Sequence, residues 1–131
     1  MRLVPEHRAL LAAQNGLLPS GWKSQDIGTV RKAGSSTCEA WGLFTINASG
    51  WGAWGPEDSL HFAYRSWKGD GQFIARIARV DHSHGAMAGG IMIRESLAPD
   101  APMAAACLHP NGQTRLNRRP TGDAPEFHEV N

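Results

Sequence analysis

Three tryptophans in predicted loops have the chemistry to bind a carbohydrate. Trp51 and Trp54 lie in the Gly-rich segment 49–55, and Trp67 ends a predicted strand. A flat indole ring offers an apolar face on which the C–H face of a sugar stacks, while nearby polar groups bond to its hydroxyls. Loop positions allow such rings to be exposed. The alternative is that each ring packs in the interior, and the sequence leaves both interpretations open.

Three cationic or titratable side chains form a second group of candidate ligand-binding residues. His61, Arg76 and Arg94 lie on strand faces opposite the main apolar sets. The guanidinium fork of an arginine can bond to the hydroxyls or carboxylates of a bound molecule. The alternative is that these groups cover a dimer interface or form internal salt bridges. Acidic partners for such bridges are Asp58, Asp70 and Glu95.

No metal site is predicted. His82 and His84 place two imidazoles on one side of an extended segment beside Asp81, but no third ligand follows at a set spacing. A solvated loop is the better interpretation. For calcium, Asp58 and Asp70 are too few carboxylates to supply the six or more oxygens it requires.

Catalytic groups are also not predicted. A glycosidase needs two carboxylates flanking one sugar bond, whereas the adjacent Glu57 and Asp58 point to opposite faces of an extended chain. No serine or cysteine lies in a Gly-x-Ser-x-Gly context. The Gly-rich segments join predicted strands rather than opening helices, so no phosphate-binding loop is expected. We therefore expect no catalytic residue and no cofactor, with a glycan-active enzyme as a less favoured alternative.

Composition favours one all-β domain that does not bind nucleic acid. The 131 residues are 41% hydrophobic and 19% charged, which suits a single globular core. The 15 glycines and 8 prolines imply many turns. A net charge of +1 supplies no broad positive field for phosphates or anionic lipid.

Cysteine usage and the first residues bear on the compartment. Cys38 and Cys107 are expected to be free buried thiols rather than a disulfide. The apolar run 9–13 is too short for the core of a standard export signal, and no segment has the roughly 20 apolar residues of a membrane span. No export or membrane insertion is therefore expected from this sequence.

Local patterns predict one helix, a series of strands and a loose tail within a single domain, residues 1–131. Pro5 suits a first helical turn and Asn15-Gly16 a left-handed cap, so a helix is expected over residues 5–15, in an N-terminal segment 1–17. Alternation then predicts strands at 27–30, 37–48, 59–67, 72–81, 89–95, 103–108 and 113–117, in a sandwich spanning 18–119. The turns 68–71 and 109–112 indicate hairpins. Residues 120–131 have no period and are expected to be a loose tail.

A set of short phrases in fixed order extends from about residue 18 to about residue 122. They are Gly21-Trp22, Asp26-Ile27-Gly28, Gly42-Leu43-Phe44-Thr45-Ile46, Trp54-Gly55, Asp58, His61-Phe62, Tyr64, Gly69-Asp70-Gly71, Ala75-Arg76 and Ile91-Met92-Ile93-Arg94-Glu95-Ser96. In these phrases the chain resembles the concanavalin A-like β-sandwich modules described as regulation of enolase protein 1-like, or as a domain of unknown function. The resemblance implies a jelly-roll type antiparallel sandwich. Such modules are usually found in exported bacterial proteins, often beside carbohydrate-active domains.

The chain departs from this family in two ways. The family's sandwich continues for several strands beyond the position of Gly122, so this one is reduced by roughly a third, and its open edges would invite another chain. We therefore expect two copies to associate and complete each other. In addition, Ala86 and Ala88 stand where the family usually has a Trp and a Lys.

These observations together predict a non-catalytic binding module for a carbohydrate or other small polar ligand on the concave sheet face. The candidate ligand-binding residues are Trp51, Trp54, His61, Arg76 and Arg94. The alternative is a structural or protein-interaction module with no small-molecule ligand.

Overall fold

The chain folds as antiparallel β-structure, as the all-β prediction requires. A computed structural model describes residues 2–5, 17–81, 88–121 and 126–130. In these ranges it has ten strands and one short 3₁₀ turn, η2. The elements in chain order are β1 (Arg2–Pro5), β2 (Lys23–Ile27), β3 (Ser35–Glu39), η2 (Ala40–Gly42), β4 (Leu43–Asn47), β5 (Leu60–Tyr64), β6 (Ala75–Arg79), β7 (Gly89–Arg94), β8 (Met103–Leu108), β9 (Thr114–Arg119) and β10 (Glu126–Val130).

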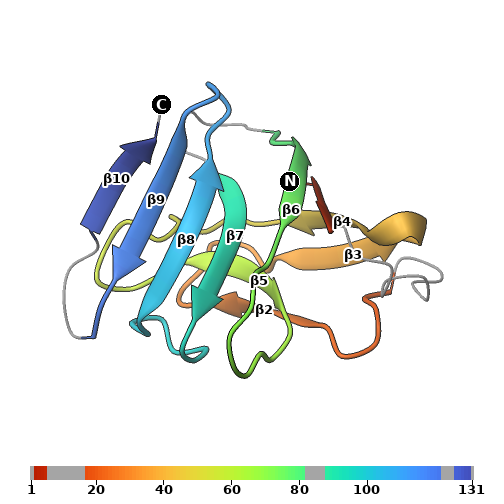
Figure 1. Cartoon of the computed structure of the whole chain (residues 1–131), viewed down its shortest axis with the longest axis horizontal. Coiled ribbons are helices and arrows are strands. Elements are labelled where there is room, and N and C mark those ends of the chain that lie inside the picture. The colour runs from red at the N-terminus through yellow and green to blue at the C-terminus, as the bar shows by residue number, and fades with distance from the viewer. Residues whose placement is uncertain (1, 6–16, 82–87, 122–125, 131) are drawn as a thin grey trace.

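The strands form three sheets. One four-stranded sheet has the order β3-β4-β1-β6, a second has the order β10-β9-β8-β7, and β2 pairs with β5 alone. In Figure 1 the second sheet stands upright, while β2, β3, β4 and β5 run across it. The edge strands β6 and β7 are not hydrogen-bonded to each other.

The turn between β8 and β9 is the hairpin that the sequence predicts. Gly112 adopts a φ of 86°, which a side chain would disfavour. Its N–H donates to the carbonyl of His109 at 2.9 Å, and the His109 N–H donates to the carbonyl of Gln113 at 2.8 Å. The side chain of Asn111 accepts the N–H of Gln113 at 3.0 Å. These bonds fix a register in which Ala105 lies opposite Asn117.

Two other predictions about strand connections are wrong. The strand expected over 37–48 is two strands, because η2 and the φ of 75° at Gly42 reverse the chain so that β3 and β4 pair with each other. The turn at 68–71 does not form a hairpin, because β5 pairs with β2 whereas β6 pairs with β1. Non-local partners decide both outcomes.

The predicted element limits need three further corrections. β2 ends at Ile27, where the strand 27–30 was expected to begin, because Gly28 has a φ of 69°. The expected loose tail contains β10, which pairs along β9 from Glu126 to Val130. Pro5 ends β1 rather than opening a helix, and residues 6–15 of the expected helix lie outside the described ranges.

Two apolar clusters form the interior. In one, Cys38 and Phe44 are buried beneath partly buried neighbours, and the Trp22 and Phe44 rings lie 4.8 Å apart. In the other, the buried side chains of Ala53, Met103 and Ala105 join β8 to the loop between β4 and β5. The partly buried members of both clusters are Leu18, Trp22, Leu60, Ala63, Met92 and Cys107.

A buried ionic cluster lies beside the second apolar cluster. Arg119, at 2% exposure, donates Nη1 and Nη2 to the Oδ1 and Oδ2 of Asp58 at 2.6 and 2.9 Å. Arg94 donates Nη1 to the same Oδ2 at 2.8 Å. The remaining N–H groups of Arg119 donate to the carbonyls of Gly55, Pro99 and Ala101. This cluster, Asp58–Arg94–Arg119, joins the β4–β5 loop to β7, to β9 and to the β7–β8 loop.

Substitution of Asp58 by alanine is expected to lower the free energy of unfolding by about 3–5 kcal/mol, because it leaves two guanidinium groups buried without their carboxylate. Urea denaturation of the variant measures this loss. Asp70→Ala, in the exposed turn 68–71, is the matched control and should change stability by no more than about 0.5 kcal/mol. Equal effects of the two substitutions would contradict the role given to the cluster.

Candidate functional site

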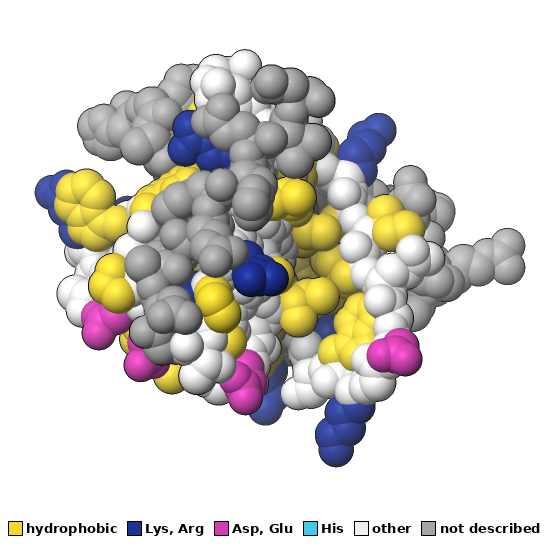
Figure 2. All heavy atoms as spheres, turned by 60° about the vertical axis from the view of Figure 1, so that its left-hand side comes forward, with side chains coloured by type: hydrophobic (Ala, Val, Ile, Leu, Met, Phe, Trp, Pro, Cys, Tyr) yellow, Lys and Arg dark blue, Asp and Glu magenta, His cyan; other side chains and the backbone are white. Residues whose placement is uncertain are grey.

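A cleft of about 1470 Å³ brings four of the five candidate ligand-binding residues together. Its lining residues come mainly from β4, β5, β7 and the β2–β3, β4–β5 and β5–β6 loops, and they include Trp51, Trp54, His61 and Arg94. Arg76 is exposed on β6 and is not part of the lining. Figure 2 shows hydrophobic side chains gathered around a hollow in one face of the molecule.

The most accessible part of the cleft is aromatic. Trp51 is 78% exposed and Trp67 is 48% exposed, as the loop interpretation of these rings expects. Phe62 and Tyr64, which share one face of β5, stack with their centroids 5.6 Å apart and their planes at 10°. All four rings line the cleft. The cleft therefore offers several flat apolar surfaces.

Trp54 has a different environment and forms a wall. Its ring centroid lies 5.4 Å from that of His109, and the Cζ atom of Arg115 lies 5.8 Å from its ring centroid. The backbone approaches it closely, since a Cβ atom at Gly52 would overlap the indole nitrogen. Trp54 is thus held in place by a residue of β9 and by its own loop.

His61 is oriented by a carboxylate. Its Nδ1 lies 2.7 Å from Oδ1 of Asp26, its cross-strand neighbour on β2. The hydrogen bond with His61 lowers the pKa of the Asp26 carboxyl, and a bond from the Gly34 N–H acts in the same direction. The imidazole is 4% exposed, because Gly34 packs so closely that a Cβ there would overlap the ring. Its Nε2 atom is buried without a hydrogen-bond partner.

The Arg94 side chain is buried, and its donors are used within the protein. Its guanidinium pairs with Asp58, donates from Nε to the carbonyl of Ser96 at 2.6 Å, and donates from Nη2 to the carbonyl of Ala98. Its side chain is 2% exposed. Of the two interpretations left open for this residue, the internal salt bridge with Asp58 is the one found.

Sequence reasoning missed a polar row on β9. Arg115, Asn117 and Arg119 alternate along one face of this strand, opposite Cys107, Ala105 and Met103 of β8. Polar residues at period two beside an apolar strand would have been the signal. Asn117 is 2% exposed, lines the cleft, and has neither amide atom in a hydrogen bond.

The described part of the chain has no cluster of three metal-binding side chains, and residues 82–84 lie outside it. Cys38 and Cys107 are free thiols whose pKa values are raised by burial. Thiols of this kind are weak nucleophiles at neutral pH. No helix among the described residues has the length and hydropathy to cross a membrane.

Comparisons with other proteins assign no family. No protein-family model, no curated protein and no solved structure matches this chain. The geometry of the cleft must therefore carry the functional argument.

Substitution of Asp26 by asparagine should lower stability at pH 7, because the carboxylate with the lowered pKa is then lost. A lowered pKa in the folded state stabilises above the ordinary value of 3.8 and stops doing so as the pH falls through the lowered value. The stability difference between Asp26→Asn and the unsubstituted chain should therefore disappear at strongly acidic pH. Thermal unfolding across a pH series measures it.

Asp100→Asn, at an exposed position, is the control and should keep the acid dependence of the unsubstituted chain. A stability difference for Asp26→Asn that stays constant from neutral to strongly acidic pH would contradict the role given to the Asp26–His61 pair.

Proposed function

We propose that this chain is a non-catalytic binding module, on a concanavalin A-like sandwich of jelly-roll type, and that it takes a carbohydrate in the cleft. The observation that carries the proposal is the exposure of Trp51 and Trp67 on one cleft beside the stacked rings of Phe62 and Tyr64. Exposed apolar patches that polar residues surround commonly mark ligand-binding or interaction sites. The apolar faces of sugar rings can cover such a patch.

The size and polarity of the cleft favour an oligosaccharide. Sites for drug-sized molecules have volumes of about 300–1,000 Å³, and this cleft exceeds that range. Polar groups accompany the rings, since Arg31, Lys32 and Asn117 also line the cleft. A ligand with several linked rings would contact the aromatic and polar parts together.

Binding without catalysis agrees with the state of the carboxylates. Asp58 is held between two guanidinium groups and is 1% exposed, so its carboxylate is not accessible to a glycosidic bond of a ligand. Glu57, its neighbour, is exposed and is not part of the cleft lining, so the adjacent pair Glu57 and Asp58 does not flank one ligand.

Trp51→Ala should weaken oligosaccharide binding by about tenfold or more while changing stability by no more than about 0.5 kcal/mol, because the ring is exposed and packs little. Calorimetric titration with cellotetraose, xylotetraose and mannotetraose measures the affinity of each protein. At least one of these probes should bind the unsubstituted chain.

Leu17→Ala is the matched control, since Leu17 is 72% exposed and does not line the cleft. It should leave affinity unchanged. Failure of the unsubstituted chain to bind any of the three probes would overturn the carbohydrate proposal.

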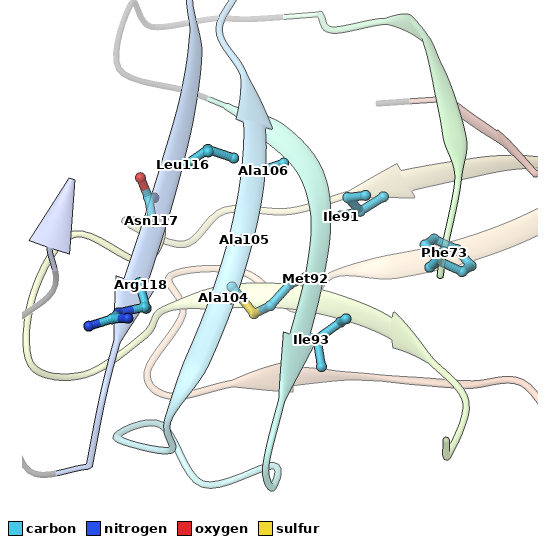
Figure 3. Close-up of a pocket in the computed structure, with 10 residues that line it drawn as sticks. All are labelled: Phe73, Ile91, Met92, Ile93, Ala104, Ala105, Ala106, Leu116, Asn117 and Arg118. Atoms are coloured by element: carbon cyan, nitrogen blue, oxygen red, sulfur yellow. The ribbon is translucent and has the colours of Figure 1, made fainter. Parts of the chain in front are cut away.

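A second candidate function is association between copies of the chain. A groove of about 610 Å³ crosses β7, β8 and β9, with Phe73 at its far side (Figure 3). Its apolar side chains include Ile93, 67% exposed, and Leu116, 44% exposed. On the face where Ile93 and Leu116 lie, β8 contributes Ala104 and Ala106. Larger side chains thus flank a row of small ones, a shape that a second copy can fill with its own isoleucines.

Ile93→Lys should convert a dimer to a monomer, because a charge would be desolvated in the interface. Light scattering at micromolar concentration should give twice 14.2 kDa for the unsubstituted chain and 14.2 kDa for the variant. Ile74→Lys, at a 53% exposed position outside the groove, should remain dimeric. A monomeric mass for the unsubstituted chain would reject association.

A further inference from the structure

The polar row on β9 contains one side chain whose presence the fold does not explain. Arg119 is bonded to Asp58, and Arg115 lies over the ring of Trp54. Asn117, between them, is as buried as Arg119, yet neither its Oδ1 nor its Nδ2 has a hydrogen-bond partner. Its cross-strand neighbours are Ala105 on β8, a small apolar residue, and Phe127 on β10. Folding therefore desolvates this amide without compensation.

The unsatisfied amide belongs to the cleft. Asn117 is part of the cleft lining together with Met92, Ala105 and Trp54, and it also borders the groove shown in Figure 3. Arg115, whose Cζ atom lies 5.8 Å from the ring centroid of Trp54, precedes Asn117 by two residues on the same strand face. The cleft lining thus contains both an aromatic wall and an unpaired primary amide.

A primary amide has a donor and an acceptor side by side. Two hydroxyls on adjacent sugar carbons match this pair, because one accepts the Nδ2 proton while the other donates to Oδ1. A simple aliphatic ligand would leave both amide atoms unpaired. The amide therefore selects for a ligand with neighbouring hydroxyl groups.

We propose that Asn117 is the specificity-determining residue of the cleft, and that its side-chain amide binds a pair of adjacent ring hydroxyls of the oligosaccharide. This inference rests on the proposed function and names the residue that would recognise the hydroxyl groups of the sugar. It predicts a combination of effects that a structural residue would not give. Removing the amide should stabilise the empty protein and weaken ligand binding together.

The test uses Asn117→Leu in the full chain with the tetrasaccharide that binds the unsubstituted protein. Leucine resembles asparagine in shape and suits apolar neighbours, so the melting temperature should rise by a few degrees. Affinity measured by calorimetry should fall by about tenfold or more. Asn111→Leu, in the exposed turn between β8 and β9, is the matched control and should leave affinity unchanged.

A second measurement covers the case in which Asn117→Leu fails to fold. In ¹H–¹⁵N spectra of the unsubstituted chain, with Asn117→Asp used for assignment, the side-chain NH₂ signals of Asn117 should shift on addition of the same tetrasaccharide. Unchanged NH₂ signals, or a stabilised Asn117→Leu that binds normally, would overturn the inference and leave the proposed function standing. Absence of binding to cellotetraose, xylotetraose and mannotetraose by the unsubstituted chain would overturn both.

Discussion

The bidentate pair between Asp58 and Arg119 is the interaction on which the arrangement of the cleft depends. The pair is almost fully buried. Arg119 also donates hydrogen bonds to backbone carbonyls, and Asp58 also accepts one from Arg94. A buried pair of this kind stabilises little relative to an apolar core, but it enforces one arrangement because any alternative leaves charges unpaired. Here it anchors to β9 the loop that carries Trp51 and Trp54. The position of the aromatic rings thus follows from an ion pair on the other side of the same loop.

This constraint divides the polar residues of the cleft by role. Arg94 contributes to structure, since its donors are used by Asp58 and by carbonyls of its own loop. His61 is likewise fixed by Asp26. Among the groups that stay accessible or unsatisfied are the rings of Trp51 and Trp67, the amide of Asn117 and the Nε2 atom of His61. Recognition in such a site would combine broad apolar contact at the opening with directional hydrogen bonding at one interior position.

The sequence predicts where individual strands lie better than it predicts which strands pair with each other. Alternation gives β8 with its observed limits, and the turn at 109–112 gives its hairpin. Pairing of β1 with both β4 and β6 depends on residues far apart in the chain, which periodicity does not report. The same limit applies to the cleft, in which four of the candidate residues lie. Asp58 and Arg119 are 61 positions apart, so periodicity could not show that they pair with each other. It therefore could not show that Asn117, on the same face of β9, is left without a hydrogen-bond partner.

The central place of β1 in its sheet has a consequence for folding. Its neighbours β4 and β6 both follow it in the chain, and the second of them ends at Arg79. One edge of β1 must therefore stay unpaired during folding until β6 is available. Large sequence separation of this kind slows folding and prolongs the exposure of backbone groups. Assembly of this sheet is therefore expected to be a late step of folding.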